Sequence, residues 1–144
     1  MKVLTKIRRW SWEFPQSLLG AILLLFYKRD ILRTIEYRDQ KVNICDSFPG
    51  GISLGYYVFV KYKKPSYLDP GRIERLKTSV KHESGHGVQS KYLGPLYLLT
   101  VSILSGVHCL ICTIKDKYKI PYNYYAFITE KSADKLGGVK REIL

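Results

Sequence analysis

The sequence is short of acidic residues: it holds 12 Asp and Glu against 24 Lys and Arg, a formal net charge of +12. A chain this basic is attracted to polyanions, either nucleic acid or an anionic membrane surface. It carries no zinc knuckle, basic zipper or RNA-recognition signature, so no nucleic-acid partner is expected. Because the basic residues form short clusters that flank apolar segments, we predict an anionic membrane surface as a partner. Alternatively, these charges keep a small apolar protein soluble.

Cysteine is also scarce, and an odd count of three argues against a disulfide framework. Cys109 and Cys112 fall within an apolar run, where free cysteine commonly packs. The protein is therefore expected to work in a reducing compartment or in a membrane. No small-x-small cleavage site follows the first apolar stretch, so a cleaved signal peptide is not expected.

The hydrophobic pattern predicts a single small α+β domain over residues 1–144, and residues 1–30 should form an apolar helix. The uninterrupted apolar part of this segment, Ser17 to Tyr27, has 11 residues. A membrane-spanning helix needs about 20. Trp10, Trp12 and the neighbouring basic residues are typical of the membrane–water boundary. We predict an interfacial helix, with a buried core helix as the alternative.

Between residues 33 and 62 the apolar period changes to two, which predicts a small antiparallel β meander of about three strands. Turns are expected near Asp39 and Gln40 and at Pro49-Gly50-Gly51. The last strand should be long, because apolar residues alternate from Ile52 to Tyr62.

Residues 72–144 should supply three helices. After a loop from Lys63 to Gly71, the first helix should begin near Arg72 and end at Gly94-Pro95. The second, Leu93 to Ile114, has 22 residues without Asp, Glu, Lys or Arg. It is long enough to span a bilayer, and a buried central helix is the alternative. The last should run from about Tyr124 to Leu136 and end at Gly137-Gly138.

His82-Glu83-Ser84-Gly85-His86 is an HExxH motif within the first of these helices. Residues i and i+4 lie on one helix face, so both imidazoles can reach one metal ion. Glu83 then lies beside the open position of the metal. There it can take a proton from a water whose pKa zinc lowers towards ~7. The alternative is an ordinary surface pair of histidines next to a glutamate.

A catalytic zinc site needs a third protein ligand, and the sequence offers two sources of it. Glu130 and Asp134 lie at i and i+4 on the last helix. Glu130 can complete a His₂Glu site, and Asp134 can accept a hydrogen bond from the other ring nitrogen of a ligand histidine. The second source is the group His108, Cys109 and Cys112. These residues sit in an apolar helix without partners to orient them, so we favour Glu130.

Four more polar residues are candidates for supporting roles. Gln89 is seven residues after His82 and lies on the same side of the helix. It either orients a ligand or caps the helix surface. Tyr122, Tyr124 and Tyr125 carry phenols that can donate to a developing oxyanion. Their more common role is packing or anchoring at an interface.

The run HESGH followed by Glu130-x-x-Ala133-Asp134 resembles the gluzincin class of metallopeptidases. The ExxAD pattern is especially similar to the membrane gluzincins of the CAAX-prenyl-endopeptidase and heat-shock membrane protease type. Closer still, HESGHGVQSKYLGPLYLL with TEKSADKLGGV resembles a group of short bacterial proteins with the patterns HExGHxxQSxxLGxLYL and TExxADxLGG. The resemblance covers mainly residues 80–99 and 124–139.

This resemblance implies a zincin-like metal site with a defined role for each matching residue. His82, His86 and Glu130 would be the zinc ligands, and Glu83 would be the general base. Asp134 would accept a hydrogen bond from one of the ligand histidines. The chain is shorter than the larger membrane gluzincins and lacks their several spans. It also lacks a later aspartate motif of the site-two protease type.

We therefore predict a membrane-associated zinc metallopeptidase, located at the bacterial cytoplasmic membrane and without a cleaved signal peptide. Its substrate would be a peptide or protein, and the edge of the strand from Ile52 to Tyr62 could pair with it. Two alternative classes are a non-catalytic protein that zinc stabilises and a metal-free basic interaction protein of the membrane.

Overall fold

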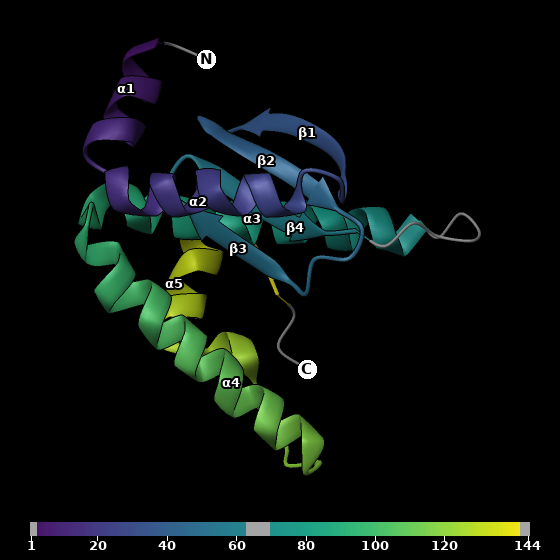
Figure 1. Cartoon of the computed structure of the whole chain (residues 1–144). Helices are drawn as coiled ribbons and strands as arrows, with labels where there is room; N and C mark the ends of the chain where they lie inside the picture. The colour runs from purple at the N-terminus through teal and green to yellow at the C-terminus, as the bar shows by residue number, and fades with distance from the viewer. Residues whose placement is uncertain (1–2, 63–69, 142–144) are drawn as a thin grey trace.

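The computed structural model describes residues 3–62 and 70–141 and has the predicted α+β architecture (Figure 1). Helices α1 (Val3–Ser11) and α2 (Phe14–Tyr27) precede a sheet of β1 (Ile31–Tyr37), β2 (Gln40–Cys45), β3 (Gly51–Leu54) and β4 (Tyr57–Lys61). The long helix α3 (Pro70–Leu93) follows. A π-helical turn, η1 (Leu98–Ser102), continues into α4 (Ile103–Lys117). A 3-10 turn, η2 (Tyr124–Ala126), precedes α5 (Ile128–Gly137).

The sheet is mixed, with the strand order β1-β2-β4-β3, and this corrects the predicted antiparallel meander of about three strands. The single strand expected from Ile52 to Tyr62 is a hairpin, in which Leu54 pairs with Tyr57. Gly55 closes its two-residue turn with a φ of +57°, a conformation that side chains disfavour. The connection after β2 crosses to the far edge of the sheet. The hairpin therefore returns β4 alongside β2 in a parallel pair.

Helices cover both faces of the sheet, with α2 on one side and α3 on the other (Figure 1). Along β4, Val58 and Val60 pack in a cluster with Val80 of α3. The intervening Tyr57 and Phe59 pack on the side of α2. Successive residues of one strand thus enter two different cores, which explains the nearly continuous apolar run of β4.

The N-terminal segment forms two helices instead of one, and α2 is half-buried. Gly20 on its inner side lies against Tyr57 of β4. Leu25 and Phe26 on its outer side are 74% and 80% exposed. The helix therefore contributes to the core and also presents an apolar surface.

The boundaries of α3 agree with the prediction at one end and differ slightly at the other. The helix ends at Leu93, and Gly94 follows with a φ of +53°. Most of the loop expected from Lys63 to Gly71 lies outside the described residues. Its last two residues, Pro70 and Gly71, belong to the first turn of α3, where the missing N–H of proline is tolerated.

The long apolar helix begins later than predicted, because the turn at Gly94 separates it from Leu93. In the described part of the chain, one helical stretch, Leu98–Lys117, is long and apolar enough to cross a membrane by length and composition. Its mean hydropathy is 1.8, and 11% of it is buried. The last predicted helix is divided by an extended Phe127, so α5 starts at Ile128, and Gly138 ends it in the left-handed conformation.

Candidate metal site

Helices α3 and α5 cross at very short range, because small residues lie where they meet. A Cβ atom added to Gly85 would lie 2.7 Å from the carbonyl carbon of Ala133 and would overlap its oxygen. One added to Gly137 would lie 2.8 Å from the carbonyl carbon of Lys81. This close crossing carries the acidic residues of α5 to the HExxH segment of α3.

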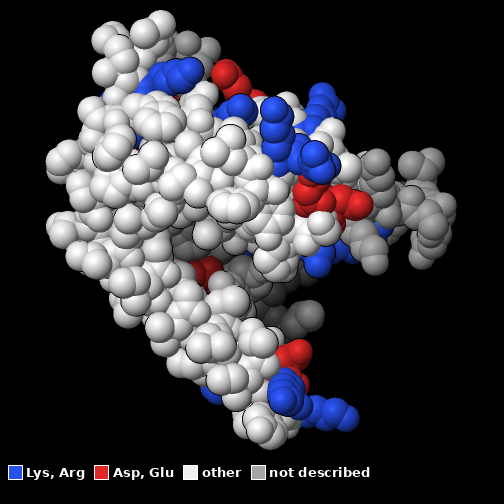
Figure 2. Space-filling model, viewed as in Figure 1, with Lys and Arg blue, Asp and Glu red and all other residues white. Residues whose placement is uncertain are grey.

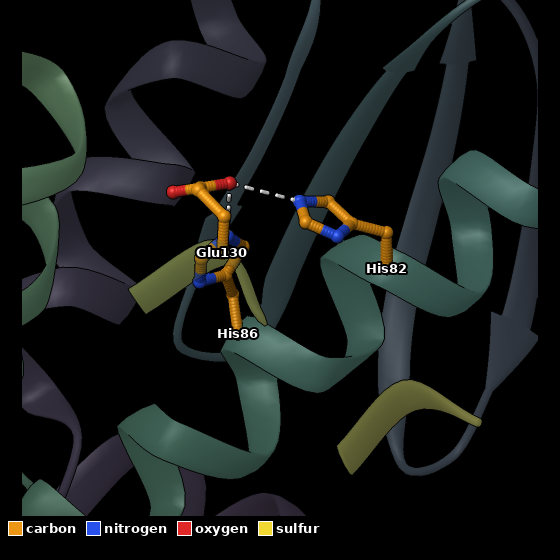
Figure 3. Close-up of side chains that lie close together, drawn as sticks. All are labelled: His82, His86 and Glu130. Atoms are coloured by element: carbon orange, nitrogen blue, oxygen red, sulfur yellow. Dashed lines mark hydrogen bonds and ion pairs between the residues drawn. The ribbon is translucent and has the colours of Figure 1, made fainter. Parts of the chain in front are cut away.

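Three buried side chains converge at the crossing (Figure 3). The Oε2 atom of Glu130 lies 3.1 Å from His82 Nε2 and 3.4 Å from His86 Nε2. One potential donor atom from each residue lies within 4.8 Å of the other two. Among the described residues, this is the one group of His, Cys, Asp and Glu gathered closely enough to hold a metal ion. These three residues can therefore bind a metal.

The second nitrogen of each histidine ring has its own acceptor. His82 Nδ1 lies 2.7 Å from Asp134 Oδ1, and a carboxylate can only accept, so the proton is on this nitrogen. His86 Nδ1 lies 2.7 Å from Gln89 Oε1. The amide of Gln89 is oriented by its Nε2, which donates to the Thr129 carbonyl at 2.9 Å and also to the Ser132 hydroxyl. The Gln89 oxygen therefore faces His86 and accepts a hydrogen bond from its Nδ1–H.

When both rings are neutral, this arrangement leaves a lone pair on Nε2 of each ring, and both lone pairs face the Glu130 carboxylate. Two unprotonated ring nitrogens and a carboxylate oxygen repel one another unless a cation lies among them. Protons on both Nε2 atoms would require two charged imidazoles in one buried site, which is costly. The donor set and its orientation therefore fit a metal ion.

The site lies in a cleft of about 870 Å³ between β3, α3, α4 and η2. Figure 2 shows the molecule hollowed between α4 and the sheet, with acidic atoms at depth. Glu83 lines this cleft, and its carboxyl group lies against Gly51 of β3. The small or polar side of α4, which includes Ser105 and Gly106, forms the opposite wall.

The environment shifts the pKa values of Glu83 and Glu130, two carboxyl groups of the cleft, in opposite directions. Burial raises the pKa of the Glu83 carboxyl above its usual value, although His86 and His82 oppose the shift. Burial also opposes the ionisation of Glu130, but hydrogen bonds from the His82 and His86 rings, when these carry a proton on Nε2, outweigh it and hold the Glu130 pKa well below its usual range. Glu130 is thus a carboxylate at neutral pH, as a metal ligand must be. Glu83 is suited to exchange a proton.

Of the three tyrosines predicted as oxyanion donors, the structure brings two to the cleft. Tyr124 and Tyr125 line it, and the Tyr125 ring lies 5.4 Å from the His82 ring. Tyr122 is 43% exposed and is not among the described residues that line the cleft. Tyr97 also lines it, with its hydroxyl donating to the Ser53 carbonyl at 3.1 Å. Nothing in the sequence distinguishes Tyr97 from its apolar neighbours.

Arg141 is a second residue that the sequence analysis did not select. Its Nε and Nη2 donate to the Asp134 carboxylate at 2.6 and 3.1 Å. Its guanidinium also stacks on the Tyr125 ring, 3.2 Å from the centroid. Arg141 therefore holds both the acceptor of His82 and a wall of the cleft in place.

The other proposed source of a third ligand has a different role. His108 Nε2 donates to the Tyr124 carbonyl at 2.9 Å, and its ring stacks on Phe127 at 4.3 Å. Cys112 is buried, with its sulfur 3.5 Å from the same ring nitrogen. Cys109 is exposed and lines the cleft. None of the three joins the group around Glu130, and His108 holds η2 against α4.

A buried polar network ties the helix of the HExxH motif to the N-terminal helices. Arg9 donates to Glu13 at 2.7 Å and to the Gly87 carbonyl at 3.0 Å. Ser90 donates to the same Glu13 carboxylate at 2.6 Å. Because Arg9 and Glu13 are almost fully buried, α1 and α2 help to position α3.

Comparisons of the chain with protein-family models, with curated proteins and with solved structures find no match. The resemblance to the gluzincins therefore stays a prediction.

Proposed function

We propose that the protein is a zinc-dependent peptidase that works at a membrane. The observation that carries the proposal is the convergence of His82 Nε2, His86 Nε2 and Glu130 Oε2 in a cleft that also holds Glu83. Two imidazoles and one carboxylate are a ligand set that zinc takes in catalytic sites, where a fourth position stays open for water. Zinc is favoured over Mg²⁺ or Ca²⁺ because two of the three donors are imidazoles.

In the proposed reaction, a water molecule attacks a peptide carbonyl and the C–N bond breaks. Zinc, when bound, would supply a Lewis acid that lowers the pKa of water in the site. Glu83 accepts a proton from the attacking water and returns it to the nitrogen of the leaving amine. Its pKa is raised by burial, which makes Glu83 a stronger base than an exposed carboxylate. Asp134 and Gln89 keep the two ligand nitrogens aimed at the ion.

The edge strand β3 offers a place for an extended substrate. Tyr97 donates to the Ser53 carbonyl from the side opposite β4, so this carbonyl points away from the sheet. In an antiparallel strand the N–H of a residue points the same way as its carbonyl. Ser53 therefore presents backbone groups towards the cleft that it lines. A peptide that pairs there would run beside Glu83.

The proposed membrane location, at a bacterial cytoplasmic membrane, rests on the outer surface of α4 and α2. The side of η1 and α4 away from the cleft exposes large apolar residues: Leu99, Ile103, Leu104, Val107, Leu110, Ile111 and Ile114. Figure 2 shows that residues other than Lys, Arg, Asp and Glu cover α2 and most of α4 in this view, with both basic and acidic residues at the far end of α4. Apolar surfaces of this extent mark sites of interaction. A net charge of +12 favours an anionic lipid surface as the partner.

Metal analysis of the purified protein tests the first half of the proposal. Wild type should carry one zinc per chain, and both His82→Ala and Glu130→Ala should lose it. Absence of zinc in wild type after refolding with the metal would refute the proposal and favour a metal-free interaction protein.

Cleavage of a peptide library tests the second half. Glu83→Gln should keep zinc but lower the cleavage rate by about 10²–10⁴-fold, since this is the usual contribution of a general base. Glu36→Gln, on the far edge strand β1, is the matched control and should cleave normally. If zinc is bound but Glu83→Gln changes no activity, and chelation unfolds the chain, the metal is structural instead.

A further inference from the structure

The edge of β3 that faces the cleft is short, because one of its carbonyl groups already has a partner. Lys61 N donates to the Gly50 carbonyl at 2.9 Å, so alternate residues from Gly50 onwards bond to β4. Gly51 and Ser53 therefore direct their backbone groups away from β4. The Ser53 carbonyl accepts the hydroxyl of Tyr97 at 3.1 Å. This leaves both backbone groups of Gly51 and the N–H of Ser53 for pairing with a peptide.

Tyr97 closes the narrow end of the cleft. It belongs to the short connection between α3 and η1, is 3% exposed, and lines the cleft together with Ser102. In Figure 1, α4 begins close to the sheet and diverges from it towards its far end. The buried Tyr97 ring therefore lies where the cleft is narrowest, beside the carboxyl end of β3.

The proposed base lies further back along the same edge. The carboxyl group of Glu83 lies against Gly51, where an added Cβ atom would be 2.7 Å from the Glu83 Cδ. Ser53 follows Gly51 by two residues, which is about 7 Å along a strand. A peptide bound at this edge would have its scissile bond near Gly51 and would meet Tyr97 about 7 Å away.

The direction of the peptide decides which of its ends meets Tyr97. Antiparallel pairing is the more stable arrangement per residue. Because β3 runs from Gly51 to Leu54, an antiparallel peptide places its N-terminal side towards Ser53. The peptide residue opposite Ser53 can accept from the Ser53 N–H, but its own N–H competes with Tyr97 for the Ser53 carbonyl. The N-terminal end of the peptide therefore faces the blocked position.

We propose that Tyr97 determines substrate length, by limiting the substrate to about two or three residues on the N-terminal side of the scissile bond. The protein would then remove short pieces from the N-terminus of a peptide. A longer N-terminal extension would have to displace the Tyr97 ring and its hydrogen bond to β3. This length limit rests on the proposed peptidase function and adds a class of substrate to it.

Peptide hydroxamates test the limit without requiring turnover, because a hydroxamate binds zinc at its open position in place of the scissile bond. The zinc-loaded, full-length protein is titrated with two series of increasing peptide length. In the first series the peptide precedes the hydroxamate and occupies the N-terminal side. In the second series the peptide follows it on the C-terminal side. Affinity in the first series should rise up to about two or three residues and then fall about tenfold, as a steric overlap produces, whereas the second series should show no fall.

Variants of Tyr97 show whether this residue is responsible. Tyr97→Leu opens the narrow end of the cleft and should abolish the fall in the first series. Tyr97→Phe keeps the ring but frees the Ser53 carbonyl, so the fall should be smaller than in wild type. Tyr92→Leu is the matched control, because Tyr92 near the end of α3 is 77% exposed, and it should keep the wild-type profile. Each profile compares peptides on one protein, so a general loss of affinity does not imitate the effect.

Three results would overturn the proposal. They are a first series without a fall in wild type, a fall in the second series instead, and a wild-type profile in both Tyr97 variants. Zinc content and circular dichroism show which variants are folded, and Tyr97→Phe decides alone if Tyr97→Leu is not.

Cleavage of unmodified peptides by wild type is measured separately, and it distinguishes the length limit from the peptidase function. A length limit in binding without cleavage of any peptide keeps the limit as a property of the cleft and refutes the peptidase. Cleavage of long peptides far from their N-termini keeps the peptidase and refutes the limit.

Discussion

Replacing Gly85 with alanine would test the close crossing of α3 and α5 that assembles the site. The new methyl group would lie 2.7 Å from the carbonyl carbon and 3.0 Å from the Cα of Ala133, and it would overlap the carbonyl oxygen. These are backbone atoms, so no side-chain rotation can relieve the clash. The two helices must separate by about 1.5 Å to bring the Ala133 oxygen to an ordinary contact distance.

The expected loss of stability follows from two opposing effects. Alanine gains about 1 kcal/mol over glycine inside a helix. Overpacking typically lowers stability by about 1–3 kcal/mol, and a clash with backbone belongs at the upper end. The free energy of unfolding should fall by about 2 kcal/mol, which lowers Tm by about 4–8 °C for a chain of this size. Zinc affinity should also fall, because ligand distances must hold to within about 0.2 Å.

Thermal unfolding with EDTA isolates the effect of the clash, and competition with a chromophoric chelator measures zinc affinity. Gly106→Ala is the matched control, because an added Cβ at this position of α4 meets nothing within 4 Å. It should not lower stability or zinc affinity. A Gly85→Ala protein with the Tm and zinc affinity of wild type would refute the crossing described here.

Four further predictions concern other parts of the molecule. Asp134→Asn and Gln89→Leu should each weaken zinc binding about 10–100-fold, because each removes the acceptor that orients one ligand histidine. Competition with a chelator measures this affinity, and Asp116→Asn is the control. Unchanged affinity in both the Asp134 and the Gln89 variant would contradict the orienting role. Ellman's reagent at pH 7 should find one thiol that reacts fast, Cys109, which is exposed. Cys112 is buried, and burial together with the nearby Asp30 raises the pKa of the Cys45 thiol to about 11. Three fast thiols in the native protein would be inconsistent with the fold. Ser53→Pro removes a backbone N–H from the free edge of β3, so it should slow peptide cleavage without loss of zinc. Ser53→Ala keeps this N–H and should not slow cleavage. Equal cleavage rates for the two variants would argue against strand pairing. Leu25→Glu with Phe26→Glu should reduce flotation with anionic vesicles, because both side chains are exposed on α2, and undiminished flotation would exclude this face as a membrane contact.

The strands show where sequence periodicity misleads. The alternation from Ile52 to Tyr62 predicts one strand, but a two-residue turn at Gly55 and Tyr56 divides it. β4 is apolar at successive positions because both of its faces are covered. The parallel pairing of β2 with β4 depends on where the connecting segment leads the chain. No local pattern contains this information.

The helices were predicted more closely, because their signals are local. Gly94 and Gly138 end α3 and α5 in the left-handed conformation, as glycine commonly does. The division of the N-terminal segment into α1 and α2 is one exception, and Phe127 is another. Its extended backbone separates η2 from α5 and lets His108 of α4 hold the Tyr124 carbonyl.

The sequence by itself determines which donors the site has and that two of them share a helix face, since His82 and His86 are one turn apart on α3. Only the tertiary structure decides that Glu130, and not Cys109 or Cys112, meets them, and that Gln89, Asp134 and Arg141 orient the group. The physical reason is how far apart in the sequence the interacting residues lie. A helical turn is set by neighbouring backbone bonds, whereas the crossing of α3 and α5 depends on close packing between Gly85 and Ala133, far apart in the chain.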